Sequence, residues 1–135
     1  KGIKGKTQLA HALYDYDKDG GAMGAIDLFK LSANTIVHDC WYEVEEALTS
    51  GGLATVEVGI TGGDTDGYIA QAAFSALTLD KVSAQSEKGA LLYDSTAKDS
   101  LRDKVTAEKT VALLIATAAL TGGKVHVYLE YSDGY

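Results

Sequence analysis

The sequence predicts a mainly antiparallel, all-β protein with a sandwich or jelly-roll-like architecture, and its glycine and tyrosine usage carries that prediction. The 135 residues include 15 glycines, eight tyrosines and no proline. Glycine pairs lie between stretches rich in Val, Ile, Thr and aromatic residues, which is the pattern of strands joined by tight turns. Roughly seven or eight strands, half of them with one polar face, favour a sandwich or jelly roll. The pairs are Gly20-Gly21, Gly51-Gly52, Gly62-Gly63 and Gly122-Gly123.

The expected strands are spread along the whole chain. Residues 1–7 are expected to form a flexible basic arm, and residues 8–135 a single β-sandwich domain that buries roughly 68% of its unfolded surface. The polar stretch 96–104 predicts a helical turn or a loop, and 18–24 a turn. Strands are expected at residues 8–17, 25–31, 35–48, 53–61, 68–79, 90–93, 110–118 and 124–132.

The apolar pattern predicts a hairpin in the first half of the chain. Pairing 35–48 with 53–61 places Val44 opposite Val58, with both side chains on the apolar side. Residues 50–52 then form a glycine-rich three-residue loop, in which glycine readily adopts the positive φ that such loops need.

A second hairpin is expected to join 110–118 to 124–132. The stretch 111–116 is apolar on both faces, which indicates a central strand. Segment 47–52 is similar to segment 118–123, and we interpret this as a recurrent turn pattern, not as a true repeat. Alternation within the last strand predicts that every second side chain is exposed to solvent. The side chains between them are expected to be buried in the core, namely Val125, Val127, Leu129 and Tyr131.

Charge and hydropathy exclude two classes of partner. The formal net charge of −7 argues against nucleic acid, because phosphate contact needs clustered Lys and Arg. The longest apolar run, 111–120, is too short to span a membrane. The acidic composition has a local exception at the start of the chain, where Lys1, Lys4 and Lys6 lie among glycines. We interpret this segment either as a disordered terminus or as an arm that docks on an acidic neighbour.

Asp15, Asp17 and Asp19 resemble the opening of a calcium-binding loop, with carboxylates at alternate positions before a glycine. An EF-hand loop needs a Glu six residues after that glycine, but Ile26 occupies the position, so the EF-hand match fails. A looser Ca²⁺ site, helped by the carboxylates within 64–66, stays open beside the simpler interpretation that these residues form turns. No other cofactor is expected.

No motif predicts catalysis. His38 and Cys40 are two apart on an expected strand, so they share a predicted face, but no third metal ligand has a diagnostic spacing. The sequence contains neither a G-x-S-x-G nucleophile elbow nor an H-E-x-x-H zinc motif. No pair of carboxylates forms a recognisable acid and base. We therefore expect the protein not to be an enzyme. Because Cys40 is the one cysteine, an internal disulfide framework is excluded.

Trp41 and Tyr128 are the candidate contact residues on the folded domain. Trp41 is expected to share a face with Asp39, Glu43 and Glu45, which makes it a large apolar side chain on a polar surface. Together with tyrosines it is a candidate for a protein interface or a sugar-binding platform. The alternative is that a second sheet or the middle of the chain covers it.

Four segments resemble small structural proteins encoded in the head and tail gene modules of tailed bacteriophages. They are 31–39 (LSANTIVHD), 47–56 (ALTSGGLATV), 62–70 (GGDTDGYIA) and 119–124 (ALTGGK), and the resemblance spans 9–131. It implies a virion protein on the capsid surface that decorates or cements the capsid as a homotrimer at local symmetry axes. The implied partner is the major capsid protein or another virion protein, and no catalytic residue is implied.

Two other binding functions remain open. A carbohydrate-binding module would use Trp41 and the tyrosines, and a calcium-stabilised module would belong to a tail or extracellular protein. All three alternatives share the β-sandwich and differ in what the surface binds.

Overall fold

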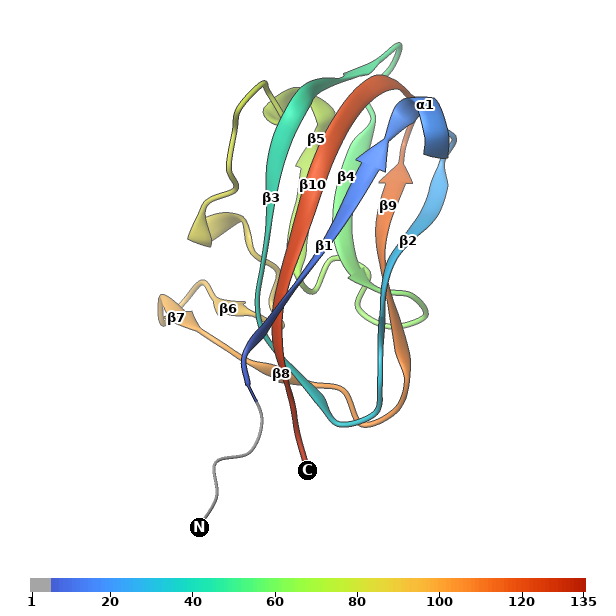
Figure 1. Ribbon diagram of the computed structural model, residues 1–135. Helices are drawn as coiled ribbons and strands as arrows, with labels where there is room; N and C mark the ends of the chain where they lie inside the picture. Colours follow the sequence, from blue (N-terminus) through green and yellow to red (C-terminus); the bar gives the residue numbers. More distant parts are fainter. Residues whose placement is uncertain (1–5) are drawn as a thin grey trace.

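The computed structural model describes residues 6–135, which form two facing four-stranded antiparallel sheets (Figure 1). The first sheet has the order β1 (Gln8–Asp15), β10 (Leu120–Asp133), β3 (Thr35–Ser50) and β8 (Asp103–Lys104). The second sheet has the order β2 (Gly24–Leu31), β9 (Lys109–Ala116), β4 (Thr55–Ile60) and β5 (Ile69–Ala73). The smaller elements are α1 (Tyr16–Asp19), the 3₁₀ turns η1 (Phe74–Ala76) and η2 (Gln85–Glu87), and a ribbon of β6 (Tyr93–Asp94) and β7 (Asp99–Ser100). None of the helices in residues 6–135 is long and apolar enough to cross a membrane.

The chain changes sheet at almost every connection. In the two main sheets of residues 6–135, β4 and β5 are the one pair of consecutive strands that hydrogen-bond to each other. Strand β10 lies between β1 and β3, so the two ends of the chain are neighbours in one sheet. Eight antiparallel strands in two facing sheets form an all-β sandwich. The predicted fold class is therefore confirmed.

The two predicted hairpins are wrong, because in each case the chain crosses the sandwich instead of turning back in the same sheet. Val44 pairs with Val125, and Val58 pairs with Leu113, so β3 and β4 lie in opposite sheets. Strands β9 and β10 are separated in the same way. The apolar pattern predicts which side chains are buried, but it does not predict which strands pair. An apolar side chain is buried equally well by a facing sheet and by a neighbouring strand.

The two similar glycine-rich segments lie side by side at one end of the sandwich. Leu120 pairs with Ser50 and Gly122 with Thr49. The Ser50 hydroxyl donates to the Ala119 carbonyl oxygen at 2.7 Å. The shared sequence pattern therefore corresponds to two sheet-to-sheet crossings that contact each other, and the two segments run antiparallel with shifts in their register.

The inner faces of the two sheets supply the core. The predicted alternation of β10 is confirmed at Val125, Val127 and Leu129, whose side chains are buried, while Tyr131 is partly buried against the core. Strand β9 is central, as expected, between β2 and β4. Other buried side chains include Tyr14, Val37, Cys40, Tyr42, Val44, Val56, Val58, Val111, Leu113 and Ile115.

A β-bulge in β3 shifts which residues face inward. The register with β10 changes between Glu130, which pairs with Asp39, and Tyr131, which pairs with Val37. One extra residue reverses the inward and outward alternation beyond it. Val37 is consequently buried, and the expected shared face of His38 and Cys40 is wrong, since Cys40 is fully buried and His38 is half-buried.

The long connection between β5 and β8 packs along the edge of β3. The Lys81 carbonyl oxygen accepts a bond from the Val44 amide at 2.9 Å, and the Tyr42 carbonyl accepts from the Ser83 amide at 2.9 Å. Glu87 accepts hydrogen bonds from Lys81 Nζ at 2.8 Å and from the Tyr42 hydroxyl at 3.1 Å. These polar contacts hold an irregular segment of the chain against the sheet.

Replacing Gly59 with Ala is expected to lower the free energy of unfolding by about 1–3 kcal/mol, the usual cost of overpacking. A Cβ at Gly59 would lie 2.2 Å from the Asp64 carbonyl oxygen, because loop 61–68 folds back over β4. Urea unfolding followed by circular dichroism measures the change. Gly51→Ala is the matched control, since nothing lies within 4 Å of its added Cβ. Equal losses in both variants would contradict the packing of this loop.

Glu87→Gln is expected to destabilise the protein by about 1 kcal/mol at pH 7, and by less in acid. Burial raises the pKa of Glu87, but hydrogen bonds from Lys81, the Ala84 amide and Tyr42 lower it by more, so the pKa lies below its usual value. Stability from such a carboxylate is complete above the unfolded pKa of about 4.3 and is lost as the pH falls through the depressed folded pKa.

Unfolding midpoints of wild type and Glu87→Gln, measured between pH 7 and pH 3, test this dependence. The control is Glu108→Gln, which removes an exposed ion pair to Lys30 at 3.7 Å and is expected to change stability little. A difference between wild type and Glu87→Gln that does not shrink in acid would contradict the assignment.

Candidate interaction face

The outer face of the first sheet carries a column of four stacked rings, which we call the ring stack: Trp41, Tyr128, His11 and His126. Their position follows from the alternation of β10. Because Val125, Val127 and Leu129 point into the core, His126 and Tyr128 point outward. Strands β1 and β3 flank β10 and place His11 and Trp41 on either side of Tyr128 in one row of the sheet.

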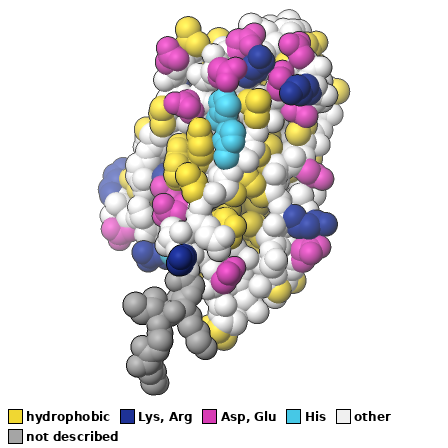
Figure 2. Space-filling model, in the orientation of Figure 1, with side chains coloured by type: hydrophobic (Ala, Val, Ile, Leu, Met, Phe, Trp, Pro, Cys, Tyr) yellow, Lys and Arg dark blue, Asp and Glu magenta, His cyan; other side chains and the backbone are white. Residues whose placement is uncertain are grey.

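The rings of the stack contact one another through their faces. The centroids of Trp41 and Tyr128 are 5.5 Å apart with planes inclined by 15°. His11 lies 4.9 Å from Tyr128 and 4.8 Å from His126. In Figure 2 the histidines lie in the middle of this face, with hydrophobic side chains beside them. The stack is continuous across three strands, so each ring restricts the rotation of its neighbours.

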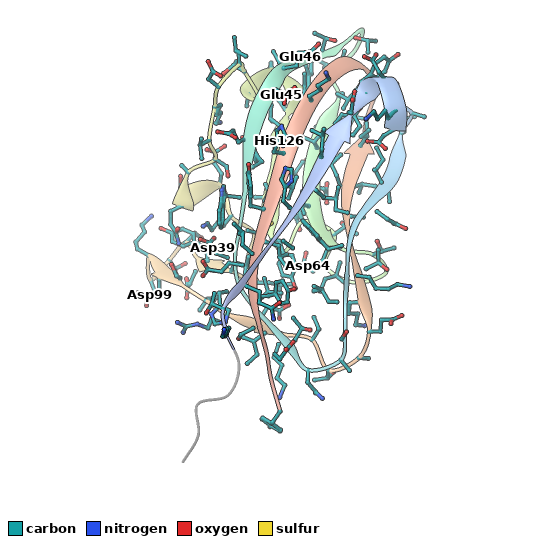
Figure 3. All side chains as sticks on the ribbon, viewed as in Figure 1. Asp39, Glu45, Glu46, Asp64, Asp99 and His126 are labelled. Atoms are coloured by element: carbon teal, nitrogen blue, oxygen red, sulfur yellow. The ribbon has the colours of Figure 1, made fainter. Side chains whose placement is uncertain are left out.

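Hydrogen bonds fix one end of the ring stack. His126 Nε2 lies 2.8 Å from Glu45 Oε1, and His126 Nδ1 lies 2.6 Å from His11 Nε2. Since an ionised carboxylate only accepts, His126 Nε2 donates to Glu45, and one proton shared between His126 Nδ1 and His11 Nε2 joins the two rings. Lys124 Nζ lies 3.6 Å from Glu46 Oε2. Glu45 and Glu46 lie above His126 in Figure 3, toward the top of the molecule. Nearby carboxylates, with Asp15 contributing most, raise the pKa of Lys124.

Exposed leucines extend the apolar surface along β1, the edge strand of the first sheet. Leu9 is 59% exposed and Leu13 is 37% exposed. With the ring stack they form a contiguous set of side chains that we call the ring-stack face. Five carboxylates lie beside these side chains on β3 and β10, from Asp39, Glu43, Glu45, Glu46 and Glu130.

The structure brings two of the predicted contact residues together and leaves others apart. Trp41 and Tyr128 pair directly across β3 and β10. Lys6 is exposed just before β1, and Lys1 and Lys4 lie outside the described residues. The segment 77–83 runs along the edge of β3 and leaves Trp41 half-exposed on the outer face.

Sequence reasoning missed the histidines of this face. His126 is two residues from Tyr128 on one strand, so their shared face was detectable from the alternation alone. His11 reaches the stack from β1, which is distant in sequence and pairs with β10 only in the folded protein. Its contribution depends on a strand pairing that no local pattern records.

Asp15, Asp17 and Asp19 serve the local turn. The Asp15 side chain caps α1 by accepting a hydrogen bond from the Asp17 amide at 3.0 Å, and Asp19 accepts one from the Asp15 amide at 2.9 Å. In Figure 3 Asp64 lies in the lower half of the molecule, far from α1 at the top. Within residues 6–135, no group of three or more His, Cys, Asp or Glu side chains is placed to hold a metal ion. Calcium binding at these residues stays a prediction.

His38 and Cys40 have separate structural roles. His38 Nε2 lies 2.7 Å from the Ser132 hydroxyl, and its Nδ1 accepts from Arg102 Nε at 3.0 Å. Cys40 is a buried free thiol, and burial, reinforced by Asp39, raises its pKa well above the usual range. A protonated, buried thiol is unreactive, so Cys40 acts as a small core residue.

The stacked geometry bears on the carbohydrate alternative. A sugar packs on the open face of an aromatic ring, but here Tyr128 has a ring on each side, from Trp41 and His11. The edges of the stacked rings are therefore what the surface offers. Protein contacts use such edges readily, because stacked aromatics present a large and rigid apolar area. Carbohydrate binding stays a prediction.

The whole fold is similar to chains in solved capsid structures of three bacteriophages. The chain matches one in the acidic stable capsid of Helicobacter pylori bacteriophage KHP30 with a TM-score of 0.58 and 18% identity, over 98% of both chains. It matches a chain of the cyanophage Pam1 capsid asymmetric unit with a TM-score of 0.66 and 17% identity, over 98% of this chain and 89% of that one. For the capsid of Ralstonia phage GP4 the TM-score is 0.60 and the identity 18%, over 96% of this chain and 86% of that one.

These similarities concern the three-dimensional fold. No protein-family model matches the sequence, and no curated protein matches it. At identities of 17–18% the fold is what is shared. The fold of this chain is one that phage capsid structures contain, in agreement with the sequence resemblance to phage structural proteins.

Proposed function

We propose that the chain is a non-enzymatic structural protein of a bacteriophage particle, located on the capsid surface and held there by protein–protein contacts. The observation that carries this proposal is the extent of the fold similarity. The matches cover 96–98% of this chain and 86–98% of the capsid chains. The comparison therefore relates complete folds and not a shared fragment.

The finer proposal is that the chain decorates or cements the capsid as a homotrimer, with the major capsid protein or another virion protein as its partner. A disulfide-free jelly-roll-like sandwich suits this function, because its rigid sheets present broad faces to neighbouring subunits. An exposed aromatic face such as the ring-stack face is the kind of surface that protein contacts bury.

Light scattering after size exclusion is expected to give a mass three times that of one chain. The same protein is expected to co-sediment with empty capsids assembled from the co-expressed major capsid protein of the same genome. Both properties are expected of a trimeric decoration protein, because weak individual contacts gain affinity when several are made together. Maltose-binding protein added to the same capsids is the control for nonspecific pelleting. Failure of the wild-type chain to co-sediment would overturn the capsid proposal, and a monomer that still co-sediments would overturn only the trimer.

The basic segment that contains Lys1, Lys4 and Lys6 is proposed to contact the adjacent copy in the trimer, whose formal charge is −7. Deleting residues 1–6 is therefore expected to weaken co-sedimentation about threefold to tenfold, as the loss of three exposed ion pairs would. Lys109→Gln removes an exposed lysine elsewhere and serves as the control. Unchanged binding after the deletion would show that the arm makes no contact.

A further inference from the structure

We infer that the ring-stack face is the docking surface of this protein, and that it recognises a protein surface with an apolar centre and a rim of Lys and Arg side chains. The inference rests on the proposed capsid function and identifies the contact surface within it. Two independent properties of the face, its rigidity and its charge, specify the chemistry of the partner.

The centre of the face is apolar and already ordered. Leu9 is 59% exposed, and Leu13 and the half-exposed Trp41 lie on the same side of the sheet. Trp and Tyr are the residues that most often dominate binding energy at interfaces. Because the stacked rings already restrict one another, binding costs little additional side-chain entropy. The partner surface must therefore offer apolar side chains at its centre.

The rim of the face is acidic. Five carboxylates on β3 and β10 flank the Trp41–Tyr128 pair. The two nearby ammonium groups are already in ion pairs, Lys88 with Asp39, and Lys124 with Glu45 and Glu46. Within residues 6–135, Glu43 and Glu130 take part in no ion pair. Their side chains lie on neighbouring strands, on two sides of the Trp41–Tyr128 pair. Complementary charge at an interface increases the association rate and selects the partner. A rim of Lys and Arg is the matching chemistry.

The same charge argues against a second copy as the occupant. Two ring-stack faces brought together in a twofold contact would bury the same acidic patch of both copies in one interface, which would bring the carboxylates of the two copies near one another. Like charges placed opposite each other across an interface are costly. The proposed trimer must accordingly use other surfaces of the sandwich.

The test uses the full-length chain and empty capsids assembled from the co-expressed major capsid protein of the same genome. Trp41→Ala is expected to weaken co-sedimentation about 30-fold or more, the usual effect of truncating a central aromatic. The double variant Glu43→Lys with Glu130→Lys is expected to weaken binding at least about tenfold at low salt. It is also expected to reduce the loss of affinity that salt causes for the wild type, since salt screens the rim contacts.

Matched variants outside the face serve as controls. Leu53→Ser changes a leucine that is 80% exposed in the connection between β3 and β4. Asp27→Lys reverses an exposed charge on β2 in the second sheet. Both are expected to bind like the wild type. Leu9→Ser, on the face but exposed, gives a second apolar variant if Trp41→Ala folds poorly, and circular dichroism checks the folding of each.

The outcomes separate this inference from the function on which it rests. Wild-type binding that survives Trp41→Ala, Leu9→Ser and the double charge reversal would overturn the docking surface and leave the capsid function standing. A Trp41→Ala variant that dissociates a wild-type oligomer into monomers would show that the face joins copies, which also overturns the inference. Absence of wild-type binding would overturn the proposed function itself.

Discussion

Strand β10 is the element on which the rest of the structure depends. It pairs along its length with β1 on one side and β3 on the other, so it joins the first and last parts of the chain. Its inward residues, Val125, Val127 and Leu129, pack the core, and burial of such side chains contributes about 1.5–3 kcal/mol each. Its outward residues, His126 and Tyr128, supply two of the four rings of the ring stack. One period-two pattern thus determines both the stability of the sandwich and the chemistry of its outer face.

The two glycine-rich crossings between the sheets lie at one end of the sandwich and therefore limit the length of its two sheets. At Gly51-Gly52 the chain leaves the first sheet for the second, and Gly122-Gly123 lie near the start of β10, just after the chain has returned to the first sheet beside Thr49 and Ser50. A Cβ at Gly123 would lie 2.5 Å from the Leu48 side chain, in a residue whose φ is +124°. Glycine is needed there for close packing as well as for backbone conformation. Both crossings are consequently close-packed parts of the fold.

Polar contacts organise the parts of the chain that regular strands do not. The connection between β5 and β8 has little secondary structure, and it is held by the Tyr42–Glu87–Lys81 cluster and by the ion pair of Lys88 with Asp39. Tyr68, fully buried, donates to the Asp103 carboxylate at 2.8 Å, and burial raises the pKa of its hydroxyl. Such partly buried polar bonds fix a single arrangement of an otherwise irregular segment.

The acidic side chains are unevenly distributed over the surface, and those on the ring-stack face determine which partners it can bind. Apolar side chains supply most of the free energy of a protein contact, whereas charges around them decide which surfaces can approach. On this chain Trp41 and Tyr128 lie between carboxylates along β3 and β10, with Glu43 on one side of the pair and Glu130 on the other. The geometry therefore favours a partner of opposite charge over a second copy of the same face.

The sequence by itself determined the long strands, the fold class and the inward residues of β10, because alternation and glycine placement are local properties that the backbone period converts into structure. It also indicated Trp41 and Tyr128 as contact residues. It did not predict the short strands β7 and β8, which lie in a stretch expected to be a helical turn or a loop. Only the tertiary structure decided which strands pair. Val44 and Val58 could pair in one hairpin or face each other from opposite sheets, and their side chains would be buried to nearly the same extent in either arrangement. Local patterns likewise could not predict the bulge beside Asp39 or the position of His11 next to Tyr128. Each depends on the register between strands that are far apart in the chain.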